Sequence, residues 1–251
     1  MNMKSIFSVL LALSFSIIMA QPVLNSPEQQ TPQGGQADEA LLAHYSKVYQ
    51  LAMGLGDIQQ QTTALLNMYA AKQDDKLLYA LSEAYLNQKE YRKAFVSINS
   101  VKDSTATEVY ATKAWILKLA GDVATSTKYF EKIIEKDKTK NDIGFQIAVN
   151  QLEAGKIAEA KKTIAQYKSL TKADEKVNTT DRTNFYLVNL NAAWENLEGL
   201  IMFLENAEDN TKLTKNKEAI LAHFDKAIAL EKDFVLAKQN KEAVLKKIGG
   251  K

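Results

Sequence analysis

The chain has 251 residues, of which 46% are hydrophobic and 25% charged, and this ordinary globular composition excludes disorder over most of its length. The 32 basic residues nearly balance the 30 acidic ones and form no basic patch, which argues against nucleic-acid binding. The absence of cysteine excludes disulfides, so the folded chain must be held together by packing alone, even if it is exported.

Residues 1–20 are predicted to be a signal peptide. Lys4 precedes an apolar run from Ile6 to Met19, and the small residue Ala20 comes before a polar break. The alternative, a membrane anchor, needs about 20 apolar residues, and this run is shorter. We therefore expect cleavage after Ala20, a mature chain without a membrane span, and export to the periplasm, with the extracellular space as the alternative.

Residues 21–38 contain all three prolines of the chain and the pair Gly34-Gly35. A segment of this composition buries too little apolar surface to fold. The sequence predicts a flexible leader here, and an ordered domain that begins near Glu39.

Four helix-turn-helix segments are predicted between residues 39 and 170. The best preserved is LSEAYLNQKEYRKAF, from Leu81 to Phe95, where apolar residues at spacings of three and four flank a polar corner. Equivalent corners recur at intervals of 33, 32 and 34 residues, which is typical of a helical repeat. The corners begin at Gly56, Lys89, Gly121 and Gly155.

The C-terminal third departs from this pattern. Residues 171–182 are predicted to be a polar linker, and residues 183–251 an atypical fifth unit. Its first helix is expected to include Leu187, Leu190 and Trp194 and to run on to Phe203. An inserted polar loop over 205–216, a second helix over 222–234 and a capping helix that ends near Ile248 are expected to follow.

The repeat resembles the tetratricopeptide repeat (TPR), a helix-turn-helix unit of about 34 residues with small residues where the helices touch and large ones between them. The proline that usually closes each TPR unit is replaced by Ala106, Lys138 and Lys172. The resemblance implies an all-α, right-handed superhelical solenoid of antiparallel helix pairs. It is carried by Leu81, Ala84, Tyr85, Tyr91, Ala94, Val101, Ala114, Gly121, Phe130, Ala148, Gly155 and Ala160.

In this family the first helices of successive units line a concave groove that commonly holds a peptide or a partner helix. Three aromatic residues, Tyr79, Trp115 and Phe145, are not demanded by the packing pattern and are hypothesised to line such a groove, where rigid aromatics favour binding. Packing against a neighbouring unit is an equally weighted alternative. The basic clamp that holds a partner's terminal carboxylate in some TPR proteins is missing. The mapped groove residues are Lys76, Tyr79, Glu83, Leu86, Glu108, Thr112, Trp115, Lys118, Phe145, Gln146 and Val149.

No catalytic, metal-binding or cofactor-binding constellation is recognised. The two histidines, His44 and His223, lie at opposite ends of the chain without a second ligand at a metal-binding spacing. An enzymatic function would gain support only if carboxylates or His223 converged in a cleft. The chain is therefore predicted not to be an enzyme and to need no cofactor.

Two functions are consistent with the sequence. The first is a non-catalytic protein- or peptide-binding scaffold of the bacterial cell envelope that uses the concave TPR groove. The second is a small-molecule or glycan binding accessory of a nutrient uptake system, with a closed pocket shaped by residues 194–203. An open groove favours a peptide, whereas an enclosed aromatic pocket favours a small ligand.

Overall fold

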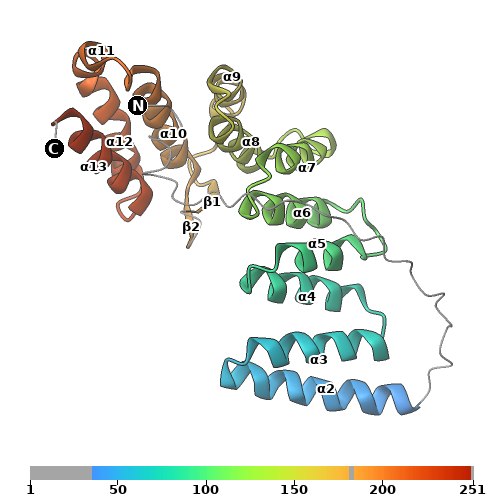
Figure 1. Cartoon of the computed structure of the whole chain (residues 1–251). Helices are drawn as coiled ribbons and strands as arrows, with labels where there is room; N and C mark the ends of the chain where they lie inside the picture. Colours follow the sequence, from blue (N-terminus) through green and yellow to red (C-terminus); the bar gives the residue numbers. More distant parts are fainter. Residues whose placement is uncertain (1–35, 181–183, 250–251) are drawn as a thin grey trace. The chain divides into compact units, whose positions relative to one another are not determined.

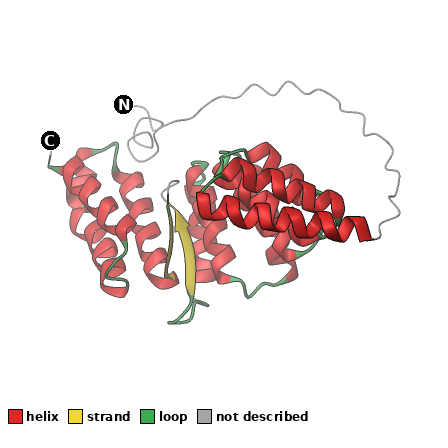
Figure 2. Cartoon of the chain, turned by 90° about the horizontal axis from the view of Figure 1, so that it is seen from below, coloured by secondary structure: helices red, strands yellow, loops and turns green. Residues whose placement is uncertain are grey.

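The structure is a computed structural model that describes residues 36–180 and 184–249 (Figure 1). The described residues form successive helix pairs and one β-hairpin (Figure 2). This confirms the prediction of a TPR-like helical repeat. The predicted signal peptide lies outside the described residues. Within them, every helix is too short or too polar to cross a membrane.

The chain divides into two compact units after Leu77. The first contains the helix pair α2 (Gln36–Leu55) and α3 (Ile58–Ala71). Ala52, Ala64 and Leu65 are buried between these helices. Helix α2 begins inside the segment 21–38 that was predicted to be a leader, so this prediction was wrong for the last residues of the segment.

The second unit contains the remaining helix pairs and the hairpin. Helix α4 begins just before the boundary between the units, and the other elements follow it in chain order. They are α4 (Asp75–Asn87), α5 (Tyr91–Asn99), α6 (Thr107–Leu119), α7 (Val123–Lys136), α8 (Asn141–Glu153), α9 (Ile157–Lys168), β1 (Lys176–Thr180), β2 (Phe185–Asn189), α10 (Leu190–Asn206), α11 (Asn210–Lys215), α12 (Lys217–Leu230) and α13 (Val235–Ile248).

The predicted corners are the places where the backbone takes a left-handed conformation. Gly56, Gly121 and Gly155 have φ values of 68°, 89° and 75°, and Lys89, with φ 60°, is the one non-glycine among the described residues with positive φ. At Gly121, the next N–H, that of Asp122, donates to a carbonyl five residues back. This geometry closes a helix in a Schellman motif, and glycine adopts it without steric cost.

A core cluster of the second unit surrounds Trp194 on α10. Its ring is fully buried and packs edge-on against Phe145 of α8, with 5.0 Å between the ring centroids. The indole N–H donates to the Thr171 hydroxyl at 3.0 Å. Trp194 therefore joins the fifth unit to the fourth as a core residue.

A β-hairpin stands where residues 171–182 were predicted to be a linker. Strands β1 and β2 pair antiparallel with Val177 opposite Val188, and both valines are buried. Leu187 lies in β2, so the expected helical position of this residue was wrong; α10 begins three residues later. Asn189 fixes that start, because its side chain accepts hydrogen bonds from the N–H groups of Asn191 and Ala192 in the first turn of α10.

The inserted segment 205–216 is also more ordered than the predicted loop. It contains the short helix α11, and the side chain of Asp209 caps it by accepting from the N–H groups of Thr211 and Lys212. Leu213 of α11 is buried, so the insertion contributes to the core of the fifth unit.

Candidate functional site

The predicted groove residues lie on the first helices of their pairs, but they differ in exposure. On α4 and α6, Glu83 and Glu108 are exposed, whereas Tyr79, Leu86, Thr112 and Trp115 are half-buried. On α6 and α8, Lys118, Phe145 and Gln146 are buried and Val149 is half-buried. Lys76 is exposed and belongs to the first unit, so it is not part of the surface that the second unit assembles.

The hairpin and α10 cover the part of the predicted groove that α8 would supply. Phe145 is 4% exposed and packs on Trp194. The Gln146 amide donates to the carbonyl of Asn178 in β1 at 2.7 Å and accepts from Lys118 at 3.1 Å. Phe145 and Gln146 are therefore core contacts in this structure, and the hypothesis that they face a partner is corrected. Residues distant in sequence cover them, which helical spacing on α8 could not reveal.

Three apolar side chains from α6 and β2 form a surface beside this covered region, and we call them the hairpin patch: Trp115, Phe185 and Leu187. The Trp115 ring packs edge-on against Phe185, with 5.6 Å between the ring centroids. Phe185 and Leu187 are 55% and 61% exposed. Large apolar side chains grouped at a surface in this way are typical of interaction sites.

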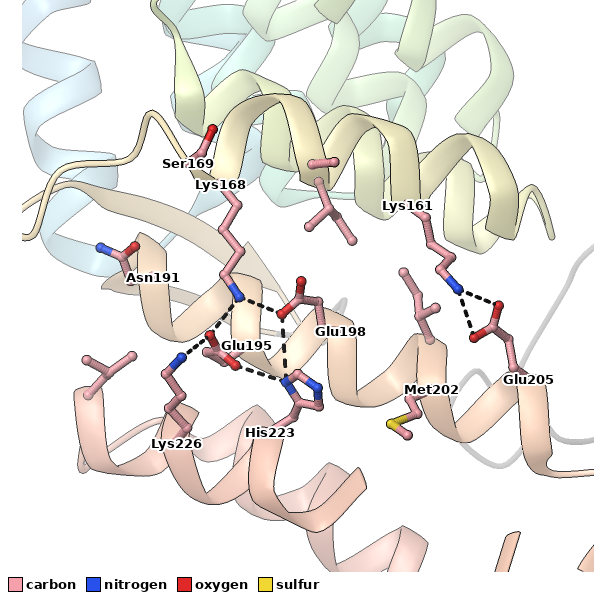
Figure 3. A pocket seen from close by; sticks show the side chains of 14 residues that line it. Lys161, Lys168, Ser169, Asn191, Glu195, Glu198, Met202, Glu205, His223 and Lys226 are labelled. Carbon is pink, nitrogen blue, oxygen red and sulfur yellow. Dashed lines mark hydrogen bonds and ion pairs between the residues drawn. The ribbon is translucent and has the colours of Figure 1, made fainter. Parts of the chain in front are cut away.

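A cleft of about 870 Å³ lies between α9, α10 and α12 (Figure 3). Ion pairs cross it: Lys161 of α9 bonds Glu205 of α10, and Lys168 of α9 bonds both Glu195 and Glu198. Its apolar lining includes Ile164, Ala165, Ile201, Met202 and Leu230.

Glu195 is the centre of the charged cluster in this cleft. Its side chain is only 3% exposed. One carboxylate oxygen accepts from Lys168 at 2.6 Å and from Lys226 at 2.7 Å, and the other lies 2.9 Å from Nδ1 of His223. Figure 3 shows these groups converging from three helices. A buried carboxylate is stable only when it is bonded in this way.

The electrostatics of the cluster keep Glu195 ionised. Burial alone would raise the pKa of Glu195, but the hydrogen bonds from Lys168, Lys226 and His223 outweigh burial and lower the pKa to about 2. Burial likewise opposes the charge of Lys168, and its bonds to Glu195 and Glu198 raise its pKa overall. Because general acid catalysis requires a pKa near the working pH, Glu195 is poorly matched to that role.

The structure thus brings carboxylates and His223 together, which is the condition that would have favoured an enzyme. The ligand atoms of Glu195, Glu198 and His223 also lie within 4.8 Å of one another, close enough to surround a metal ion. However, Lys168 and Lys226 already place ammonium groups on these carboxylates. A divalent cation would be repelled by both ammonium groups, so we interpret the cluster as an ion-pair network between helices.

Sequence reasoning missed this cluster because its members come from separate helices. Glu195 follows Trp194 directly in a largely apolar stretch of α10, and an acidic residue in such a stretch is a signal that could have identified it. His44, the other histidine, is exposed on α2 and stacks edge-on against Tyr45.

The cleft does not resemble a glycan site. Among the residues that line it, the imidazole of His223 is the one aromatic ring. Trp194, which was expected to shape a small-ligand pocket, is buried in the core instead. Trp194 therefore does not supply the aromatic wall of an enclosed pocket, the geometry that would favour a small ligand.

Comparisons with known proteins support the fold. No protein-family model matches the chain, and no curated protein matches its sequence. Among solved structures, MamA from Desulfovibrio magneticus RS-1 is similar with a TM-score of 0.56 at 12% identity, over 80% of this chain and 98% of that one. YrrB, described as a TPR protein with an unusual peptide-binding site, has a TM-score of 0.52 at 13% identity, over 82% and 98% of the two chains. A thermophilic TPR protein from Thermus thermophilus has a TM-score of 0.50 at 12% identity, over 83% and 98%. At these identities the comparisons show a shared TPR fold.

Proposed function

We propose that this chain is a non-catalytic, exported scaffold that binds a protein or peptide through the hairpin patch and the neighbouring faces of α4 and α6. The hairpin patch is the observation that carries this proposal. Trp115 is anchored on one side by Phe130 at 6.0 Å between ring centroids and on the other by Phe185. Rigid, partly exposed aromatic side chains of this kind lose little conformational entropy when they bind a partner.

Two further observations support protein binding over the small-ligand alternative. The fold resembles that of YrrB, a TPR protein described as having a peptide-binding site. The cleft beside α10 has bonded charges and no aromatic lining apart from an imidazole. A peptide or protein surface is the better match for an exposed apolar patch.

Affinity purification of the tagged full chain from its own cell envelope tests this proposal. The partner is expected to copurify with the wild type and to be lost with Trp115→Ala combined with Phe185→Ser. The matched control is Val96→Ser, because Val96 is 58% exposed on α5 and lies outside the hairpin patch. A partner set that is the same for all three chains contradicts binding through the patch.

The cell-envelope location rests on the predicted signal peptide, residues 1–20. We expect the chain, expressed from its full coding sequence in a double-membraned bacterium, to reach the periplasm with Gln21 as its new N-terminus. Cell fractionation and N-terminal sequencing measure this. A variant that lacks residues 2–20 should stay in the cytoplasm. A full-length chain that keeps Met1 and stays in the cytoplasm contradicts export.

A further inference from the structure

The hydrogen bonds around the hairpin show which way each backbone group of β2 points. In an antiparallel pair, residues alternate between those that bond across the pair and those whose N–H and C=O point outward. The N–H of Leu190 donates to the carbonyl of Glu175, so these two residues form a hydrogen-bonded pair. Val177 and Val188 lie two residues further along the two strands and form the next hydrogen-bonded pair. Residues at odd numbers in β1 and at even numbers in β2 therefore bond across the hairpin.

The outward-pointing groups of the hairpin confirm this alternation. The carbonyl of Asn178 in β1 points away from β2, because it accepts from Gln146 of α8. The N–H of Asn189 in β2 points away from β1 and donates to Glu231. By the same alternation, Phe185 and Leu187 present their N–H and C=O groups at the outer edge of β2.

The two edges of the hairpin differ in what covers them. The edge of β1 is held by α8 through Gln146. At the edge of β2, Phe185 and Leu187 are more than half exposed, and the structure gives their backbone groups no hydrogen-bond partner outside the hairpin among the described residues. The strand reads FYLVN and has none of the charges or prolines by which proteins usually protect an exposed edge.

We propose that β2 accepts an extended segment of a partner protein as a third strand of this small sheet. The proposal rests on the proposed function and gives its binding mode. The partner's backbone bonds the outward N–H and C=O groups of Phe185 and Leu187, and its alternate side chains pack against the hairpin patch. Because the inner face of the hairpin is fixed by buried Val177 and Val188, the edge is already formed before a partner binds.

The area and charge around the edge favour a partner segment over a second copy of this chain. Two copies that met at β2 would bury roughly a few hundred Å² there, far less than the roughly 1,200–2,000 Å² of a stable interface. A longer segment can continue from β2 along α6, where Thr112 and Glu108 lie about one and two turns before Trp115.

An acidic side chain on α6 sets the expected charge of the partner. Glu108 lies about two turns before Trp115 on this helix, is exposed and forms no ion pair with a described residue. A segment that carries lysine or arginine beside its apolar residues would complement it. The occupant is therefore an extended, basic and apolar segment of a partner protein.

A random dodecapeptide phage library is the probe for this inference. The library is selected on protein purified after expression of the full chain, and peptides that also bind the Trp115→Ala variant are removed. The tightest selected peptide is synthesised, and its affinity is measured by fluorescence anisotropy. It is then N-methylated at one backbone nitrogen at a time, which removes single N–H donors.

Strand addition predicts a period of two in this series. Methylation at alternate residues should weaken binding about tenfold, and methylation at the residues between them should have little effect. Leu187→Pro, which removes an outward N–H, should weaken binding by a similar factor and by more than Leu187→Val, which keeps the donor. Val96→Ser, which lies outside the hairpin patch, should bind nearly as the wild type. If the proline variant loses its hairpin, the methylation series still tests strand addition, because it leaves the protein unchanged.

The outcomes separate this inference from the function on which it rests. A peptide that needs Trp115 but shows no period of two overturns strand addition and leaves the binding scaffold standing. Selected peptides enriched in acidic residues overturn the proposed occupant. A wild-type dimer in sedimentation that Leu187→Pro dissociates identifies a second copy as the occupant and also overturns it. A selection that yields no peptide dependent on Trp115 overturns the proposed function itself.

Discussion

Replacement of Glu195 by glutamine tests the charged cluster that joins α9, α10 and α12. Glutamine keeps the size of the side chain but removes the negative charge, so Lys168 and Lys226 lose their shared partner and His223 loses a carboxylate. Because Glu195 is 3% exposed, water cannot replace the lost interactions fully. The substitution should therefore destabilise the second unit.

The expected magnitude follows from the pKa of Glu195, which falls from 4.5 to about 2 on folding. At about 1.4 kcal/mol for each tenfold change in acidity, this sets an upper bound of about 3 kcal/mol on the contribution of the charge. Lys226 is 63% exposed, so solvent screens part of the attraction. We expect a loss of about 2 kcal/mol in the free energy of unfolding at neutral pH.

The sign of the pH dependence is fixed by the direction of the same pKa. A carboxyl group whose pKa is lower in the folded state stabilises the protein above its ordinary pKa, and this stabilisation disappears as pH falls toward the folded value. The difference between wild type and Glu195→Gln should therefore be full at pH 7 and shrink as pH falls below 4.5 toward 2.

Urea unfolding followed by circular dichroism at several pH values between 3 and 7 measures this difference. Glu205→Gln is the matched control, because it removes an exposed ion pair with Lys161 on the same cleft and should cost at most about 1 kcal/mol. The reasoning is refuted if Glu195→Gln costs no more than Glu205→Gln at pH 7, or if its cost does not change with pH.

Three further substitutions, one of them with a matched control, test the packing of α8, a helix corner and the bond that holds β1. Gly144→Ala would place a Cβ 2.4 Å from the Tyr167 ring, and calorimetry should show a loss of about 1–3 kcal/mol in the free energy of unfolding. An unchanged unfolding temperature would contradict the packing of α8 on α9. Gly155→Ala forces alanine to a φ of 75° and should lower the free energy of unfolding in urea by about 1–2 kcal/mol. The control Gly54→Ala, in an open position of α2, should be neutral or slightly stabilising. Equal effects of the two substitutions would argue against the left-handed corner. Gln146→Leu removes the hydrogen bond to the carbonyl of Asn178, so amide hydrogen exchange in β1 and β2 should become at least severalfold faster. Unchanged exchange would show that this hydrogen bond does not hold β1 in place.

The repeat could be predicted from the sequence because its signals are local. Apolar residues three and four apart define a helical face, and a residue suited to positive φ ends the helix. Gly56, Gly121 and Gly155 satisfy that need through the absence of a Cβ. Lys89 adopts the same conformation at the cost of strain, and the spacing of the repeat still located its corner.

The hairpin could not be predicted in the same way because its signal is short and ambiguous. Leu187, Leu190 and Trp194 are spaced like one face of a helix, yet Tyr186 and Val188 alternate with Phe185 and Leu187 as in a strand. Contacts distant in sequence decide between the two, including the burial of Val177 against the same core as Trp194.

The sequence by itself determined the helical repeat and its four corners, since each depends on residues within one or two turns of the chain. It also pointed to Trp115 as a hypothetical groove residue, and the structure packs this ring against both Phe130 and Phe185. Only the tertiary structure decided that Phe145 is a core residue, that Glu195 of α10 meets partners from two other helices, and that β2 presents an unprotected edge. Each of these depends on side chains or backbone groups that are far apart in sequence, and no local pattern records which of them meet.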